Sequence, residues 1–409
     1  MPQFSAADHA HMARALRLAE RGLYTTMPNP RVGCVIAHGD AVVGEGWHQR
    51  AGEPHAEVFA LREAGARAIG ATAYVTLEPC AHFGRTPPCA DALIAAGVGR
   101  VVAACEDPNP KVAGAGMRRL QAAGVAAESG LMREAARELN RGFFSRLERK
   151  RPWVRIKLAM SLDGRTALAN GASKWITGEP ARADVQHWRA RSSAILTGSG
   201  TVLADNPRLT VRLEALSHRE QREGRGDSGE DAGPAAPERP AVTGPSPGPL
   251  GHPVPMGEGR AQVLPLRVVL DRGLRTPGGA NVLDGCVPTL IVHGAGIQPL
   301  DDRFAGVELM AVPLHDGHLD LAVVLARLAE RGVNELQVEA GPILCGALFD
   351  QGLVDELVLY VAPVILGDKA RPLLSLPIID TISAGHRLRV VDQRQVGTDL
   401  RLLLSCSDS

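Results

Sequence analysis

The sequence has no excess of either charge and few aromatic residues. Lys plus Arg and Asp plus Glu each number 45 in 409 residues, and Phe, Trp and Tyr together make up 3%. A chain without a net electric field or many aromatic side chains lacks the usual means of attracting nucleic acid. The first ten residues contain no basic stretch before an apolar run, and no apolar run approaches the ~20 residues of a membrane span. We therefore expect a cytoplasmic protein that acts on a small molecule, without membrane or nucleic-acid partners.

A disulfide framework is missing as well. Seven cysteines, an odd number spread over a long chain, indicate a reducing compartment in which thiols stay free. Five of them lie in apolar runs or near the C-terminus and are expected to pack rather than react. These five are Cys34, Cys105, Cys286, Cys345 and Cys406.

The remaining two cysteines belong to a pattern with metal-binding character. The sequence reads H-A-E at residues 55–57 and P-C at 79–80, and Cys89 follows Cys80 with eight residues between them. One imidazole and two thiolates would hold zinc in a hydrolytic deaminase, leaving the fourth position for water and Glu57 for proton transfer. A structural zinc site would need a fourth protein ligand, which His82 could supply, so that alternative stays open.

Alternating strand-like and helix-like segments predict an α/β domain over residues 1–147. Ser5 can cap a first helix that ends near Gly22, and a hairpin follows. His55 and Cys89 should each begin a helix, so two helix N-termini would stabilise the thiolates. A long helix is expected over residues 131–150.

A second α/β domain is predicted over residues 151–409. The expected strands include 153–160, 193–197, 209–213, 266–270, 289–293, 335–339 and 356–364, with a terminal hairpin at 388–391 and 400–404. No G-x-G-x-x-G follows its first strand, which disfavours a Rossmann fold. Residues 217–262 contain eight Pro, nine Gly and no aromatic residue, and are expected to form a disordered insertion.

Two sets of motifs resemble the bifunctional deaminase/reductase family of riboflavin biosynthesis. The first set comprises P-N-P-R-V-G-C-V at 28–35, H-A-E, L-E-P-C-A-H-F-G-R-T-P-P-C at 77–89 and D-P-N-P at 107–110. The second comprises K-L-A-M-S-L-D-G at 157–164, S-K-W-I-T at 173–177, G-T-V-L-A-D-N-P at 200–207 and V-E-A-G-P at 338–342. The resemblance implies a cytidine-deaminase-like three-layer α/β/α domain with a mixed sheet, followed by a dihydrofolate-reductase-like α/β domain.

The resemblance also implies a reaction and a set of deaminase residues. The substrate would be 2,5-diamino-6-ribosylamino-4(3H)-pyrimidinone 5′-phosphate, with Zn²⁺ held by His55, Cys80 and Cys89 and with Glu57 as the catalytic proton carrier. The base and ribose phosphate would be bound by Asn29, His48, Arg85, Asp107 and Asn109. Asn29 and Asn109 could instead be turn formers before proline, and His48 could be a plain exposed residue.

The reductase half would transfer hydride from NADPH to the first ribosyl carbon. By resemblance, NADPH would contact Ala159, Trp175, Thr201, Asp205, Gly341, Pro342, Ile343, Leu344, Cys345, Gly346 and Ala347. Substrate would contact Ser173, Arg189, Leu209, Arg212 and Glu339. Arg189 as a solvated helix charge and Trp175 as plain core remain alternatives. Lys157, Asp163 and Asp205 are candidate proton donors, and Arg272 stands where the family usually has Ser.

Two other functions compete with this interpretation. A cytidine or guanine deaminase could be fused to an unrelated NADPH reductase, although nucleoside deaminases usually show C-x-x-C. A non-enzymatic binding module with structural zinc is disfavoured by balanced charge and by the intact Glu57. A homo-oligomer is compatible with the sequence.

Overall fold

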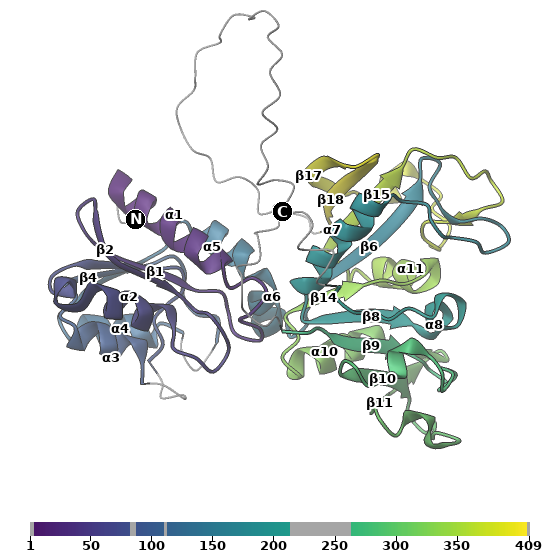
Figure 1. Ribbon diagram of the computed structural model, residues 1–409, viewed down its shortest axis with the longest axis horizontal. Helices are drawn as coiled ribbons and strands as arrows, with labels where there is room; N and C mark the ends of the chain where they lie inside the picture. The colour runs from purple at the N-terminus through teal and green to yellow at the C-terminus, as the bar shows by residue number, and fades with distance from the viewer. Residues whose placement is uncertain (1–3, 82–86, 110–112, 213–262, 407–409) are drawn as a thin grey trace, which may run out of the picture.

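The computed structural model describes residues 4–81, 87–109, 113–212 and 263–406, which form two large sheets that do not share a strand (Figure 1). The predicted insertion at 217–262 lies outside the described residues. The first sheet has the order β2–β1–β3–β4–β5, in which β1 runs antiparallel to both neighbours and the other pairs are parallel. Its strands are β1 (Gly33–His38), β2 (Ala41–Trp47), β3 (Thr72–Val75), β4 (Arg100–Ala103) and β5 (Ala126–Ser129).

Helices cover both faces of this sheet. Val35 and Ala37 of β1 face α1 (Ala6–Glu20), α5 (Arg133–Leu139) and α6 (Arg141–Phe144). Cys34 and Ile36 face the layer of α2 (Ala56–Ala64), α3 (Cys89–Ala95) and α4 (Ala115–Ala122). Since both faces are buried, the strand reads as a continuous apolar run. The predicted three-layer α/β/α arrangement with a mixed sheet is confirmed, and so is the Ser5 cap of α1.

The long helix predicted over residues 131–150 is wrong. Met132 has a positive φ of 55°, α5 ends at Leu139, and the last turn is a π-helix at Ser145–Arg149. Between α5 and α6, the side chain of Asn140 accepts from the N–H of Arg31 and donates to the carbonyl of Arg31. The helix is interrupted where Asn140 makes this tertiary contact, which the helical periodicity does not register.

The second sheet has nine strands in the order β11–β10–β9–β8–β14–β6–β15–β18–β17. All neighbours from β11 to β15 are parallel, and β18 and β17 add an antiparallel edge. Its strands are β6 (Trp153–Ser161), β8 (Ala194–Gly198), β9 (Leu266–Leu270), β10 (Thr289–Gly294), β11 (Glu308–Val312), β14 (Glu335–Val338), β15 (Glu356–Ala362), β17 (Arg389–Val396) and β18 (Asp399–Ser405).

The terminal hairpin was predicted correctly, whereas the strand at 209–213 was not. Residues 206–212 belong to no strand, because Leu209 has a φ of 50°, which an extended strand cannot accommodate. β11 was not predicted. Two small sheets pair β7 (Arg165–Ala167) with β16 (Arg371–Pro372) and β12 (Leu314–His315) with β13 (His318–Leu319). Short 3-10 turns occur at Gly65–Ala68, Asn281–Leu283, Asp302–Phe304 and Ile382–Ala384.

Helices also cover both faces of the second sheet. Ile156 and Val338 lie on the face packed by α10 (Leu321–Glu330) and α11 (Pro342–Asp350). The opposite face packs α7 (Glu179–Ala190) through Trp188 and α8 (Ser199–Asp205) through Val202.

Because the strands β8, β14 and β6 are adjacent and parallel, their carboxyl ends lie together at one edge of the sheet. Their amino ends lie at the opposite edge, beside α6 and the first domain (Figure 1).

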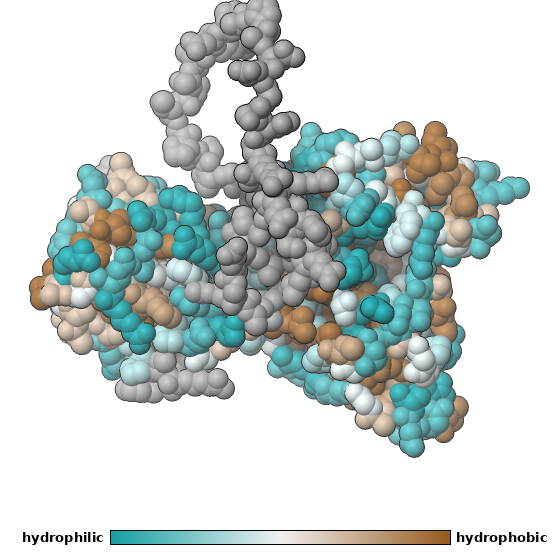
Figure 2. Space-filling view, in the orientation of Figure 1, coloured by the Kyte–Doolittle hydropathy of each residue, from teal (hydrophilic) through white to brown (hydrophobic). Residues whose placement is uncertain are grey.

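Hydrophobic side chains are exposed on the loops that follow β15. Figure 2 shows hydrophobic surface at this end of the second domain, where Ile365, Ile378 and Ile382 are largely exposed. Within the described part of the chain, no helix has the length and apolarity needed to cross a bilayer.

Candidate active sites

Three metal-ligating side chains meet at the ends of three elements. His55 is the N-cap of α2, Cys89 is the first residue of α3, and Cys80 lies in the loop after β3. His55 Nδ1 lies 3.2 Å from Cys89 Sγ and 3.6 Å from Cys80 Sγ. Ligand atoms around a tetrahedral zinc, with bonds of ~2.0–2.3 Å, lie about 3.5 Å apart. The donor set and its spacing therefore fit a zinc ion.

The electrostatics of these three donors point the same way. The pKa of the Cys80 thiol is lowered to about 4, mainly by its hydrogen bond to Cys89 and to a smaller extent by its hydrogen bond to His55. Cys80 in turn raises the pKa of Cys89, its close neighbour, and of His55. Three donors that compete for protons at such short range favour a bound dication, because the metal stabilises two thiolates and a neutral imidazole together.

Glu57 lies in the first turn of α2, two residues after His55. Glu57 is 3% exposed, and among the described residues its Oε2 has no hydrogen-bond partner. Burial raises the pKa of Glu57, although nearby His55 acts in the opposite direction. A buried carboxylate with one unused oxygen and a raised pKa is suited to carry a proton beside the metal ligands.

Asn29 and His48 form a pair next to the metal ligands. His48 Nδ1 lies 3.1 Å from the carbonyl oxygen of Pro54, which requires the proton on Nδ1. Nε2 of His48 then accepts from the Asn29 amide at 3.1 Å, so the orientation of the Asn29 side chain is fixed. His48 is buried, and burial lowers its pKa. The alternative of an exposed polar His48 is therefore wrong, and its ring lies edge-on to His55 at 5.3 Å.

Sequence reasoning missed Glu78, which holds the loop that carries two predicted substrate residues. Its carboxylate accepts from the backbone N–H groups of Asp107, Gly114, Gly116 and Met117 at 2.8–3.3 Å. Glu78 thereby joins the segment before Cys80 to the start of α4. The signal available in the sequence was a charged residue, Glu78, directly after an apolar stretch, which indicates a buried charge with specific partners. Asp107 accepts from the N–H of Asn109, while Arg85 and His82 lie outside the described residues.

The predicted NADPH residues gather at the carboxyl edge of the second sheet. Ala159 lies on β6, Thr201 and Asp205 lie on α8 after β8, and residues 341–347 begin α11 after β14. Ligands of open α/β sheets bind at this edge. Gly341, the N-cap of α11, has no side-chain cap, and a Cβ atom there would meet nothing within 4 Å. The open N-terminus of α11 therefore fits a phosphate of the cofactor.

Three other cofactor residues divide into an exposed and a buried group. Trp175 is 70% exposed with the Arg182 guanidinium 4.4 Å from its ring centroid, so the plain-core alternative is wrong. Cys345 and Gly346 are buried, and a Cβ atom on Gly346 would lie 1.9 Å from the Ser375 carbonyl. Their side of α11 packs into the protein, so they do not line the open face that Gly341 and the exposed Ile343 share.

Arg189 and Glu339 form a two-point ion pair. Nε and Nη2 of Arg189 donate to the two carboxylate oxygens at 2.7 Å each, and Nη1 donates to the Thr210 carbonyl. Burial raises the pKa of Glu339, but Arg189 outweighs it and lowers the pKa to about 2. Arg189 is thus no solvated helix charge. Arg212 is exposed, and within the described part of the chain its guanidinium has no recorded partner.

The other predicted substrate residues differ in accessibility. Ser173 is partly exposed in the loop before α7, whereas the Leu209 side chain packs in the core beside Val202. Only the main chain of Leu209 could therefore reach a ligand.

The candidate proton donors are not equivalent. Asp163 accepts from Ser161 and from the N–H groups of Leu366 and Gly367. The Ser161 hydroxyl, more than any other contact, lowers the pKa of Asp163 to about 2, so this carboxylate anchors a turn. Burial lowers the pKa of Lys157, which keeps this candidate able to lose a proton. Asp205 is exposed. Arg272 donates to the carbonyl of Gly317.

The seven cysteines form no disulfide. Cys34, Cys105 and Cys345 are buried and Cys406 is half-buried, as expected of packing residues. Cys286 is exposed, so the prediction that it packs is wrong. It lies in a turn closed by its N–H donating to Asp284.

Comparison with known proteins gives consistent matches over both halves. Residues 5–105 match the cytidine and deoxycytidylate deaminase zinc-binding region, and residues 152–402 match the RibD C-terminal domain. The riboflavin biosynthesis protein RibD of Escherichia coli is 47% identical, over 97% of this chain and 99% of the relative. That of Haemophilus influenzae is 43% identical over 98% of each. The solved structure of Acinetobacter baumannii RibD, form 1, is 41% identical with a TM-score of 0.80, over 98% of both chains.

Proposed function

Because the chain belongs to the RibD family of riboflavin biosynthesis proteins, we propose that its two sites act in turn on one pyrimidine ribosyl phosphate. The protein is a bifunctional enzyme with a zinc-dependent deaminase and an NADP-dependent reductase. We assign deamination to residues 1–147 and reduction to residues 151–409. The proposed substrate is 2,5-diamino-6-ribosylamino-4(3H)-pyrimidinone 5′-phosphate, and the proposed product is 5-amino-6-ribitylamino-2,4-pyrimidinedione 5′-phosphate.

In the deaminase, His55, Cys80 and Cys89 would hold the zinc ion. Bound zinc lowers the pKa of a water molecule toward ~7. Glu57 takes one water proton on Oε2 and passes it to the ring nitrogen as oxygen adds to the amine-bearing carbon. It then carries the proton of the added hydroxyl group to the amine, which leaves as ammonia while the carbonyl forms. Asn29, oriented by His48, and the loop of Asp107 and Asn109 hold the base and the ribose phosphate.

In the reductase, the residues at the carboxyl edge hold NADPH, which supplies the hydride. The first ribosyl carbon of the opened imine accepts that hydride, and the imine nitrogen takes a proton. We assign the proton to Lys157, because Asp163 is occupied by its turn contacts and because burial lowers the Lys157 pKa. Glu339 holds Arg189 in place. The exposed Arg212, whose guanidinium has no partner among the described residues, would bind the substrate phosphate.

Arg212→Ala should raise KM for the ribosyl phosphate at least about tenfold while changing KM for NADPH less than about threefold. An arginine–phosphate contact contributes mainly to ground-state binding, so KM and not kcat should respond. Steady-state reduction kinetics measure both constants, and Arg327→Ala, on the exposed face of α10, is the control. A selective rise in KM for NADPH would mean that the two pockets are assigned the wrong way round.

The observation that carries the proposed function is the His55, Cys80 and Cys89 donor set beside the unpaired oxygen of Glu57. Purified zinc-loaded protein should release ammonia from the diaminopyrimidine ribosyl phosphate but not from cytidine or guanine. With NADPH present, absorbance at 340 nm should then fall by one equivalent per ammonia released. Ammonia from cytidine, or deamination without NADPH oxidation, would favour a nucleoside deaminase fused to an unrelated reductase.

We also propose a cytoplasmic location, which the seven free cysteines support, and no nucleic-acid partner, which the balanced charge supports. A homo-oligomer is proposed on the exposed Ile365, Ile378 and Ile382, because apolar groups of this kind often mark protein contacts. Light scattering tests the oligomer, and a monomeric mass at micromolar concentration would exclude it.

A further inference from the structure

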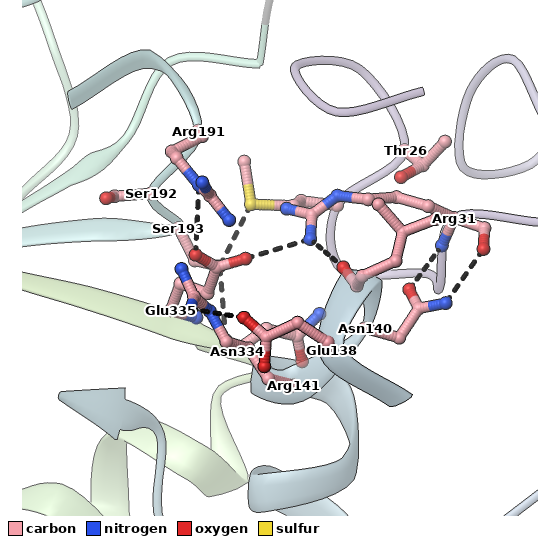
Figure 3. A network of polar contacts seen from close by, with 12 residues as sticks. Thr26, Arg31, Glu138, Asn140, Arg141, Arg191, Ser192, Ser193, Asn334 and Glu335 are labelled. Carbon is pink, nitrogen blue, oxygen red and sulfur yellow. Dashed lines mark hydrogen bonds and ion pairs between the residues drawn. The ribbon is translucent and has the colours of Figure 1, made fainter. Parts of the chain in front are cut away.

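The segment that carries Asn29 is attached to the second domain on both sides of that residue. Before Asn29, the Ser193 hydroxyl donates to Met27 Sδ at 3.0 Å, and the Asn334 amide donates to the Pro28 carbonyl at 2.8 Å. After it, Arg31 Nη1 donates to Glu335 at 2.9 Å. Figure 3 shows Ser193, Asn334 and Glu335, at the amino ends of β8 and β14, on the side of Arg31.

The attachment of Arg31 is buried and has a second component in its own domain. The Arg31 side chain is 6% exposed and that of Glu335 is 1% exposed. Arg31 Nη1 also donates to the Leu139 carbonyl, and the Arg31 backbone is bonded twice to the Asn140 side chain. Arg31 is thus held by α5, by Asn140 and by β14 at the same time (Figure 3). Because Asn29 is only two residues from Arg31, its backbone has little freedom to move independently of Arg31.

Apolar packing extends the same contact. Leu23 and Tyr24, just before the segment, pack against Ala190 of α7 and Val211 of the second domain. The Tyr24 carbonyl also accepts from the N–H of Val263. The stretch from Leu23 to Arg31 therefore contacts the reductase half near both of its ends, although Asn29 itself bonds to His48 in the deaminase.

We propose that Asn334 and Glu335 of the reductase domain are positioning residues for deamination. They fix the Met27–Arg31 backbone, and through it the place of Asn29 in the deaminase pocket. The reductase domain is then part of the deaminase binding site without touching the substrate. This inference rests on the proposed role of Asn29 as a substrate-binding residue.

The charge of the surrounding cluster shows which substitutions test this cleanly. Around the buried carboxylates Glu335 and Glu356, the described residues place four arginines, namely Arg31, Arg141, Arg155 and Arg191. Because cations exceed anions, removing Arg31 relieves an excess and leaves Glu335 paired. Removing Glu335 would instead leave Arg31 and Arg191 without a carboxylate partner among the described residues. Arg31→Met is therefore the variant expected to fold.

Asn334→Asp is a second test that does not alter the cluster arginines. The aspartate keeps an oxygen for Arg146 Nε, which donates to Asn334 at 2.6 Å, but it loses the amide donor to Pro28. Arg149→Met is the matched control. This substitution removes the ion pair between Arg149, the last residue of the π-helical turn Ser145–Arg149, and Asp355 of the second domain. Asp355 keeps Arg151 as its partner. Among the described residues, the side chain of Arg149 contacts Ser145, Trp153 and Asp355 and makes no hydrogen bond or ion pair with the Met27–Arg31 segment.

In the full zinc-loaded chain, Arg31→Met and Asn334→Asp should each raise KM for deamination at least fivefold. Their kcat, their zinc content and their constants for reduction should stay within about twofold of the parent, as should all constants of Arg149→Met. Such a split between KM and kcat, confined to one reaction, is not expected from general loosening of the interface.

Asn29→Ala separates this inference from the proposed function. If Asn29→Ala raises KM for deamination tenfold while both interface variants leave it unchanged, the positioning role is overturned and the site assignment stands. If Asn29→Ala itself has no effect on KM, the assignment of Asn29 falls, and the inference falls with it. An equal loss in Arg149→Met would also overturn the inference, because any weakening of the interface would then suffice.

Discussion

Glu57→Gln should keep about one zinc per chain and lose at least ~10²-fold in the rate of deamination, the low end expected for a positioned acid–base group. Glu57 lies beside the three zinc donors but is not among them, and glutamine preserves its volume while removing the titratable oxygen. The amide cannot accept the water proton and return it to ammonia. Metal analysis and ammonia release on the same preparation measure the two effects separately.

Cys80→Ser is the companion variant, and it should lose both the zinc and the deamination. Both variants should still reduce the already deaminated substrate with NADPH, because the cofactor residues lie at the far edge of another sheet. A Glu57→Gln protein without zinc would show that the carboxylate completes the coordination sphere. That result would favour the structural-zinc interpretation.

Glu335→Gln should lower the free energy of unfolding by about 3 kcal/mol or more, the range seen when one partner of a buried ion pair is removed. Glu335 contacts Arg31, Arg155 and Arg191, and its side chain is 1% exposed. With glutamine at this position, Arg155 keeps its ion pair with Glu356, whereas Arg31 and Arg191 keep no ion pair among the described residues. Urea unfolding of the full chain, followed by tryptophan fluorescence, measures the change. Glu330→Gln, which removes an exposed pair with Arg327, should change it by less than about 0.5 kcal/mol.

The stability difference should depend on pH in a defined direction. Burial alone raises the pKa of Glu335, but the surrounding arginines, Arg191 first, lower it well below its ordinary value of 4.5. A carboxylate with a lowered pKa in the folded protein stabilises it above the pKa of the unfolded chain, and this contribution is lost as pH falls. The gap between the parent and Glu335→Gln should therefore be full at pH 7 and narrow below about pH 4.5. A gap that widens in acid would contradict the assigned charge state.

The parts of the structure that depend on local sequence were predictable. His55, Glu57 and Cys89 lie in the first turns of helices that end-signals identify, and Cys80 lies after a strand, so spacing alone indicated the zinc donor set. The cofactor residues were predicted from the family resemblance, and the parallel order of the strands places Ala159, Thr201 and Gly341 at one edge of the sheet. Both depend on contacts between residues close in sequence or on the parallel-sheet rule, which carry a strong sequence signal.

The parts that depend on distant partners were not predictable. Asn140 interrupts a helix to bind Arg31, and Glu78 accepts from an N–H group 39 residues away. Leu209 has a left-handed backbone that hydrophobic patterning does not register. For Asn140 and Glu78 the deciding partner is far along the chain, and a single sequence does not show which polar side chains will be buried together.

The pairing of Arg31 with Glu335 has a consequence for the order in which the protein matures. The two residues are 304 positions apart, so a ribosome adding ~5–20 residues per second makes Glu335 roughly 15 to 60 s after Arg31. During that interval the nascent first domain can form its sheet and bring its zinc ligands together, but Met27, Pro28 and Arg31 lack their partners in the second domain. The half that is translated first is thus completed last, after β14 has left the ribosome.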